Sequence, residues 1–286
     1  MKLLLLATLN GVTLAALYFI VASGFTIIFG MMRVVNMAQG SLYLIGAYLG
    51  YDVASASGNW FLALAGGAAG AALIGALTHA LFLDRYQGQD LRQALVTIGL
   101  SIIAADLLLA RYGGLSYQFD VPAFLYGSTP MPIVSGYPTF RLALIGFAFA
   151  VYAVLWIVVQ RTRFGIMIRA GVDDRVMLSA LGVNVPLVST LVFALGACLV
   201  GLAGVIGGSA LSIAPGEDGR YLLSSLVVVI VGGMGSLAGA AIGALLIGLA
   251  EQIGLAYFPT YSIIVSFVIM VAVLAVRPYG LLGRPA

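Results

Sequence analysis

Charged residues are scarce in this chain of 286 residues, because 8% are Asp, Glu, Lys or Arg whereas 62% are hydrophobic. The mean hydropathy is +1.13. A soluble protein of this length needs many more polar residues to cover its surface, so the composition excludes a soluble domain. The apolar residues form long continuous runs, not the short alternating segments of a membrane β-barrel. We therefore predict an all-α, polytopic bundle of transmembrane helices.

Residue types that carry enzymatic chemistry are almost missing. Lys2 is the only lysine, which excludes both a P-loop, G-x-x-x-x-G-K-[ST], and a Schiff-base lysine. His79 and Cys198 are also single, which excludes His-rich or Cys-based metal sites and an intramolecular disulfide. We expect no catalytic residue, no metal and no cofactor. Energy for uphill transport would have to come from a partner protein or an ion gradient.

Eight apolar segments are candidate membrane helices, and we expect them to form one domain over residues 1–286. About 20 apolar residues cross the hydrocarbon core as a helix. Several of the segments are shorter than this, residues 42–56 and 94–110 especially, so tilted, interfacial or re-entrant helices are expected. The first segment is too long for the apolar part of a signal peptide and is predicted to be a retained span. The segments are residues 3–29, 42–56, 61–83, 94–110, 142–159, 187–211, 221–250 and 263–276.

Charge is concentrated in one internal segment between two apolar runs. Because arginine accumulates in cytoplasmic loops, residues 161–186 are predicted to face the cytoplasm. The charged residues of this segment are Arg161, Arg163, Arg169, Asp173, Asp174 and Arg175.

The same segment is predicted to contain two short helices. Asp173 is expected to cap the second one, which runs through Leu181 and ends at Gly182. Its apolar side chains form a patch that either lies on lipid head groups or docks a soluble subunit. The patch comprises Val176, Met177, Ala180 and Leu181.

Residues 221–250 are predicted to form a broken helix. A straight helix of this length would measure about 45 Å, and Gly232, Gly233 and Gly235 interrupt it. Arg277 also favours a cytoplasmic C-terminal tail, together with Arg284, but three simple spans after the charged segment would place the tail on the opposite side. We therefore expect a half-helix 221–231 and a second arm 237–250 that turns back, as in helices that line transport sites.

The acidic candidates at membrane depth are Asp106 and Glu251, whereas Asp52 lies near the end of a segment. Ionisable residues at membrane depth are costly and are functional candidates. Their alternative role is to lie near an interface or to pair with neighbouring helices. A proton-coupled carrier usually needs a relay of carboxylates or histidines, whereas these two residues are isolated in the sequence.

Six sequence blocks, in matching order, carry a resemblance to a known family. Residues 24–40, GFTIIFGMMRVVNMAQG, are similar to G-[LF]-x-[LI]-I-[FY]-G-x-x-[RK]-[VI]-[IV]-N-x-[AS]-[HQ]-G. The other blocks are residues 97–101, 162–184, 232–240, 248–251 and 277–283. The chain thereby resembles the permease subunits of branched-chain amino acid ABC importers, of the LivH type.

This resemblance implies a type II-like ABC importer permease in the bacterial inner membrane. It would pair with a second, homologous permease and two ATPase subunits, and a periplasmic binding protein would deliver a small amino acid, with a branched-chain amino acid as the expected substrate. The alternative is a secondary carrier of small polar solutes that uses Asp106 or Glu251 as a proton site. Gln39, Ser41 and Ser224 depart from the family pattern, which leaves other amino acids, urea and amides open as substrates.

Two sets of residues are candidates for these roles. The translocation path would be lined or gated by Arg33, Asn36, Gln39, Thr97, Ser101, Gly232, Gly233, Gly235 and Glu251. For Arg33, Asn36 and Gln39, the alternative is an ordinary turn between two spans. The ATPase-coupling surface would comprise Arg169, Asp173, Asp174, Arg175, Met177, Leu178, Leu181 and Gly182.

Overall fold

The computed structural model describes residues 2–130 and 136–283, apart from the side chains of Asp173, Arg175, Val176 and Ile263. Its elements confirm the all-α prediction. Two short strands of two residues each pair antiparallel, with Ser128 opposite Pro138. The long helices are α1 Lys2–Met32, α2 Gln39–Ser57, α3 Trp60–Thr78, α4 Asp90–Tyr112, α5 Thr139–Arg161, α8 Val185–Ala210, α9 Asp218–Gly232, α10 Leu237–Tyr257 and α11 Ser262–Val276. The short elements are the π-helix η1 His79–Leu83, the 3-10 helices η2 Asp84–Tyr86, η3 Ala123–Leu125 and η4 Pro259–Tyr261, the strands β1 Ser128–Thr129 and β2 Tyr137–Pro138, and the helices α6 Arg163–Asp173 and α7 Arg175–Ala180.

Six helices in the described part of the chain are long and apolar enough to cross a membrane. They are α1, α3 with its extension to Tyr86, α4, α5, α8 and α10. The prediction that the fourth segment is short was wrong, because α4 has 23 residues and begins at Asp90. Its polar first turn, Asp90-Leu91-Arg92-Gln93, lies outside the apolar run from which the span was predicted.

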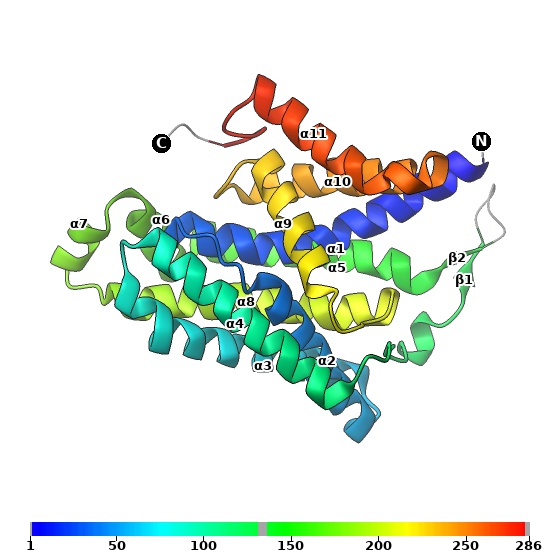
Figure 1. Cartoon of the computed structure of the whole chain (residues 1–286), viewed down its shortest axis with the longest axis horizontal. Helices are drawn as coiled ribbons and strands as arrows, with labels where there is room; N and C mark the ends of the chain where they lie inside the picture. Colours follow the sequence, from blue (N-terminus) through cyan, green and yellow to red (C-terminus); the bar gives the residue numbers. More distant parts are fainter. Residues whose placement is uncertain (1, 131–135, 284–286) are drawn as a thin grey trace.

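Helix α1 forms the centre of the bundle and contacts α5, α8, α9 and α10 (Figure 1). A helix that is apolar on all sides is expected to be buried, and α1 is buried along most of its length. Small residues bring its neighbours close. A Cβ atom at Gly248 of α10 would lie 2.6 Å from the backbone nitrogen of Ala15. Close backbone contact of this kind is how small residues stabilise packed membrane helices.

Helix α2 begins deep inside the bundle and not at its end. The side-chain amide of Gln39 donates to the carbonyl oxygen of Val21 at 3.3 Å, and Val21 precedes the end of α1 by eleven residues, about 16 Å of helix. The hydroxyl of Ser41 donates to the carbonyl oxygen of Ser101, in the middle of α4. Residues 33–38 therefore return from the end of α1 to mid-depth without forming a helix.

Helix α9 begins beside the start of α2. A Cβ atom at Gly40 would lie 2.0 Å from the carbonyl oxygen of Asp218, so no larger residue fits there. The rings of Tyr43 and Tyr221 stack, with centroids 3.9 Å apart. Irregular backbone at membrane depth is tolerated where protein surrounds it. Val34, Asn36 and Ala38 before α2 and Ile213 before α9 are buried in this way.

The predicted break between residues 221 and 250 is confirmed. Helix α9 ends at Gly232 and α10 starts at Leu237, while Gly233 and Gly235 adopt positive φ angles of 107° and 83°. A Cβ atom at Gly239 would lie 2.2 Å from the carbonyl oxygen of Gly232, so the two helices are in direct backbone contact beside the turn. An ion pair between Arg220 and Glu251 joins the opposite ends of the two arms. The segment therefore folds back on itself.

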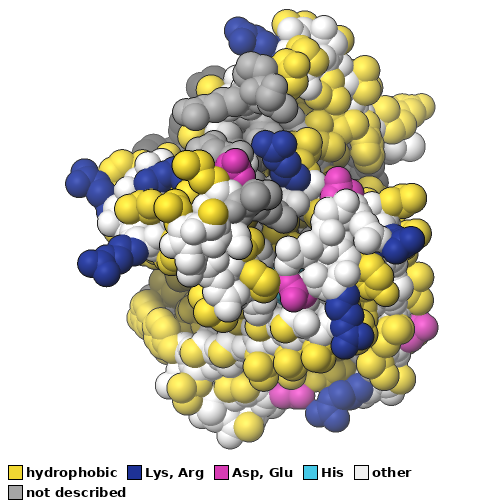
Figure 2. All heavy atoms as spheres, turned by 90° about the vertical axis from the view of Figure 1, so that its left-hand side faces the viewer, with side chains coloured by type: hydrophobic (Ala, Val, Ile, Leu, Met, Phe, Trp, Pro, Cys, Tyr) yellow, Lys and Arg dark blue, Asp and Glu magenta, His cyan; other side chains and the backbone are white. Residues whose placement is uncertain are grey.

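The C-terminal tail and the charged segment lie at the same end of the bundle, as predicted (Figure 1). The tail covers the glycine turn, because the amides of Leu281 and Leu282 donate to the carbonyl oxygens of Val231 and Gly232, each at 2.9 Å. Arginine side chains surround apolar ones on this face (Figure 2). The helix ends and loops there carry Arg33, Arg85, Arg92, Arg161, Arg163, Arg169 and Arg277.

The charged segment forms two helices, as predicted, but the residue between them, at the N-cap position of the second helix, is Asp174 and not Asp173. Helix α6 continues through Asp173, and Asp174 is the residue that leaves the helical conformation, with φ −152°. A carboxylate oxygen of Asp174 then accepts from the amide of Met177 at 3.0 Å, as an N-cap does. Gly182 ends α7 with φ 84°, and its amide donates to the carbonyl oxygen of Ser179 at 3.0 Å.

Candidate functional site

A first polar cluster holds the irregular segment before α2. Asn36 and Gln39 are 2% and 0% exposed. The side-chain oxygen of Asn36 accepts from the amide of Ala38 at 3.0 Å, and its side-chain nitrogen donates to Gln39 at 3.2 Å. Buried amides need such partners, since an unpaired polar group is costly away from water. Asn36 and Gln39 therefore position the start of α2.

Helix α4 supports the same segment from one side. The hydroxyl oxygen of Thr97 accepts from the amide of Met37 at 3.2 Å and donates to the carbonyl oxygen of Ala94 at 2.8 Å. The hydroxyl of Ser101 donates to Ile98 within α4, whereas its carbonyl oxygen accepts from Ser41. The structure thus brings four of the predicted path residues together, namely Asn36, Gln39, Thr97 and Ser101.

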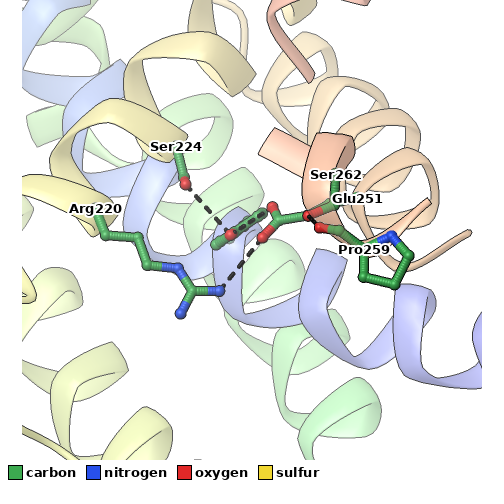
Figure 3. A network of polar contacts seen from close by, with 6 residues as sticks. Arg220, Ser224, Glu251, Pro259 and Ser262 are labelled. Carbon is green, nitrogen blue, oxygen red and sulfur yellow. Dashed lines mark hydrogen bonds and ion pairs between the residues drawn. The ribbon is translucent and has the colours of Figure 1, made fainter. Parts of the chain in front are cut away.

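A second polar cluster surrounds Glu251 on α10. Its two carboxylate oxygens accept from the hydroxyl of Tyr18 at 2.8 Å and from the guanidinium of Arg220 at 3.3 Å. Ser224 donates to the hydroxyl oxygen of Tyr18 at 3.2 Å. Figure 3 shows the Arg220 side chain of α9 pointing toward Glu251. Beside Glu251, the hydroxyl of Ser262 donates a hydrogen bond to the carbonyl oxygen of Pro259. This cluster connects α1, α9 and α10.

Both signs of charge meet where α9 begins at mid-depth. Glu217 and Asp218 stand at this helix start, where the helix dipole favours negative charge, and no side chain caps the helix at Glu217. The Arg220 side chain is 55% exposed, although Glu251 is only 12% exposed. The guanidinium of Arg220 therefore reaches the surface of the chain at this depth.

The remaining predicted path residues lie elsewhere. Arg33 is exposed at the end of α1, where it has a positive φ of 55°. Gly232 and Gly233 are buried against the backbone of α10 and of the C-terminal tail, and Gly235 lies next to Gly30 of α1. These glycines belong to the turn at the end of the bundle, apart from the polar clusters at mid-depth.

The charged segment presents an apolar surface. Met177 on α7 and Leu181 in the turn that follows α7 are 64% and 73% exposed, whereas Leu178 is buried. Arg169 donates to the carbonyl oxygen of Val159 and thereby ties α6 to the end of α5. The predicted contributions of the Asp173 and Arg175 side chains lie outside the described residues. Within the described residues, no cluster of three or more His, Cys, Asp or Glu side chains could hold a metal ion.

Sequence reasoning did not select Tyr18, Arg220 or Asp218 for the site. Tyr18 lies within an apolar run, and its polar role depends on a partner 233 positions away. Arg220 carried a usable signal, because it is an isolated cation at the start of a predicted half-helix.

Comparison with known proteins agrees with this architecture. The family model of the branched-chain amino acid transport system permease component matches residues 7–274. The chain belongs to this permease family. It is 31% identical over 299 aligned residues to the high-affinity branched-chain amino acid transport system permease protein LivH of Salmonella typhimurium, covering 96% of this chain and 94% of that protein.

Two further relatives have either a lower identity or a shorter match. The permease protein BraD of Pseudomonas aeruginosa, from the same kind of system, is 28% identical over 294 aligned residues, covering 96% of this chain and 94% of BraD. The ribose import permease protein RbsC of Haemophilus influenzae is 36% identical over 135 residues, covering 44% of this chain and 42% of RbsC. Among solved structures, PsaBC from Streptococcus pneumoniae in complex with Fab shares the fold, with a TM-score of 0.50 and 12% identity over 92% of this chain and 87% of the other.

Proposed function

We propose that this permease translocates a small amino acid, with a branched-chain amino acid as the expected substrate, across the bacterial inner membrane. Separate ATPase subunits would power the transport, a periplasmic binding protein would deliver the substrate, and a second permease would complete the path. The observation that carries the proposal is the match to the branched-chain amino acid permease family over residues 7–274. Residues 161–186 would be the cytoplasmic coupling loop of this single permease domain.

The proposed coupling surface has the chemistry of a protein contact. Met177 on α7 and Leu181 directly after it form a small exposed apolar face. An apolar face on an aqueous loop gains free energy when a partner covers it, at about 25 cal/mol for each Å² buried. An ATPase subunit that receives this face in a cleft would be coupled mechanically to α6 and α7.

A short chain of contacts connects this surface to the mid-depth clusters. A Cβ atom at Gly171 of α6 would lie 3.2 Å from the terminal methyl of Met31 at the end of α1. Residues 33–38 connect this end of α1 to the start of α2, and Asn36 and Gln39 hold that start in place. Movement of α6 and α7 would therefore reach the junction of α2 and α9, where we propose that the substrate passes.

The charges at this junction suit an amino acid. A zwitterion needs both an anionic and a cationic partner, and the start of α9 offers Glu217, Asp218 and Arg220. Broken helices with their starts at mid-depth are a recurrent feature of transport sites. A small apolar side chain would be discriminated only weakly from one that differs by a methylene group.

The proposal is tested by uptake of labelled leucine into proteoliposomes that contain the whole transporter, with binding protein outside and ATP inside. Leu181→Asp should lower ATP-driven uptake at least tenfold without changing the amount of inserted permease, because it places a charge in the apolar contact. Ser179→Asp on the opposite side of α7 is the matched control and should leave uptake within twofold of the unmodified protein.

The carrier alternative makes the opposite prediction. Uptake would continue without ATP, would follow an imposed proton gradient, and would be insensitive to Leu181→Asp. That result would overturn the ABC importer proposal.

A further inference from the structure

Helix α4 is the least buried of the candidate spans in the described part of the chain. It lies at the front in Figure 1 and packs mainly on α2. Gln93 and Thr97 are its buried residues. Its outer face is apolar, with Leu95 59% and Ile102 57% exposed. Exposure of this kind fits contact with lipid or with another membrane protein.

Asp106 distinguishes between these two possibilities. It follows Thr97 by nine residues, which places it on the opposite side of the helix, at the centre of the free face. Asp106 is exposed and makes no hydrogen bond or ion pair with the residues that the structure describes. The next cation along α4, Arg111, is paired with Asp52 at 3.1 Å. Asp106 lies about 9 Å inside the end of α4, and an ionisable residue within a membrane segment normally faces protein or water, not lipid.

Gly99 is a second, independent feature of the same face. It precedes Asp106 by seven residues, two helical turns, and a Cβ atom there would meet nothing within 4 Å. Packing within the chain therefore does not require glycine at this position. Small residues on an open membrane-helix face allow another helix to approach closely.

The charge of Asp106 also indicates which partner fits. A two-fold axis normal to the membrane places equivalent residues at equal depth, so packing α4 on α4 of a second copy would oppose two Asp106 side chains. Like charges in contact are unfavourable. The cation at the other end of the face, Arg92, is fourteen residues and about 21 Å away. The favourable partner is a different chain with a donor at the depth of Asp106.

We infer that the face of α4 around Gly99 and Asp106 packs against a transmembrane helix of a second, non-identical permease subunit. That helix would place a hydrogen-bond donor, either a cation or a hydroxyl or amide group, opposite the carboxylate. The inference rests on the proposed function, because it requires a transporter with two different permeases. It assigns the contact to α4, and Asp106 serves there as a specificity residue for the partner.

Photo-cross-linking in the intact transporter tests the contact while Gly99 and Asp106 themselves stay unchanged. A benzophenone side chain replaces Ile102 on α4 or, as the control, the 71% exposed Phe149 on α5. Mass spectrometry should find Ile102 cross-linked to a different chain that matches the same permease family, at a yield at least tenfold above that of Phe149. Cross-links only to lipid or to a second copy of this chain would overturn the inference.

Substitutions then test the two residues. Gly99→Leu should lower co-purification of the second permease at least tenfold, whereas Gly146→Leu should not, since Gly146 is an equally open glycine on α5. Asp106→Leu should also lower the co-purification of the second permease, whereas with Asp106→Asn part of the co-purification should remain. Unchanged co-purification in all the variants would contradict the inference.

The inference and the proposed function fail in different ways. ATP-independent uptake would refute the importer, whatever Ile102 contacts. ATP-driven uptake that depends on Leu181, together with an Ile102 that contacts only lipid, would refute the α4 contact and leave the importer intact.

Discussion

Replacing Arg220 by alanine is the sharpest test of the cluster that joins α1, α9 and α10. The substitution leaves the carboxylate of Glu251, 12% exposed, with the hydroxyl of Tyr18 as its remaining donor among the described residues. Because Arg220 and Glu251 join the open ends of the α9–α10 hairpin, their loss should weaken the hairpin and not only the local contact.

The expected magnitude lies between two limits. Removing one partner of a fully buried ion pair costs about 3–5 kcal/mol, whereas an exposed pair contributes about 0–1 kcal/mol. The carboxylate is mostly buried, but the Arg220 side chain is 55% exposed, so solvent screens much of the interaction. We expect Arg220→Ala to lower the free energy of unfolding by about 1–2 kcal/mol.

A double-mutant cycle separates the pair from its surroundings. Arg220→Ala, Glu251→Gln and the double variant are unfolded in detergent, and the coupling energy should be about 1 kcal/mol. Arg111→Ala is the matched control, because Arg111 and Asp52 form a pair with side chains 69% and 39% exposed. The change in this control should be smaller. A coupling energy between Arg220 and Glu251 that does not differ from zero would refute the assignment of the pair as a structural link.

Three further changes test local features of the fold by thermal unfolding in detergent. Gly239→Ala should lower the free energy of unfolding by about 1–3 kcal/mol, because a Cβ atom would lie 2.2 Å from the carbonyl oxygen of Gly232. A stability equal to that of the open-site control Gly146→Ala would contradict the close contact. Gly182→Ala should lower the free energy of unfolding by about 1 kcal/mol, since φ is 84° and a Cβ atom would meet nothing there. No change in stability would mean that this turn does not require the left-handed conformation that favours glycine. Asn59→Ala should cost about 1 kcal/mol, because the Asn59 side chain accepts from the amides of Phe61 and Leu62 at the start of α3, and Asn59→Ser should recover most of it.

Local features of this protein are determined by the sequence alone. Long apolar runs can satisfy their backbone groups in lipid only as helices, so the helical segments follow from composition and length. The break at Gly233 and Gly235 and the end of α7 at Gly182 are also local, because positive φ angles strongly favour glycine. The charge bias of residues 161–175 and Arg277 correctly required an additional reversal between them.

Tertiary structure decided how these segments meet. No local signal tells where α2 begins relative to α1, since the depth of Gln39 depends on its contact with Val21. The pairing of Arg220 with Glu251 depends on the hairpin, which brings together residues 31 positions apart. The choice of Asp174 over Asp173 as the cap depends on where α6 ends. The separation of two residues along the sequence does not specify whether their side chains meet across a bundle. The contacts between helices set the depth and the rotation of each helix.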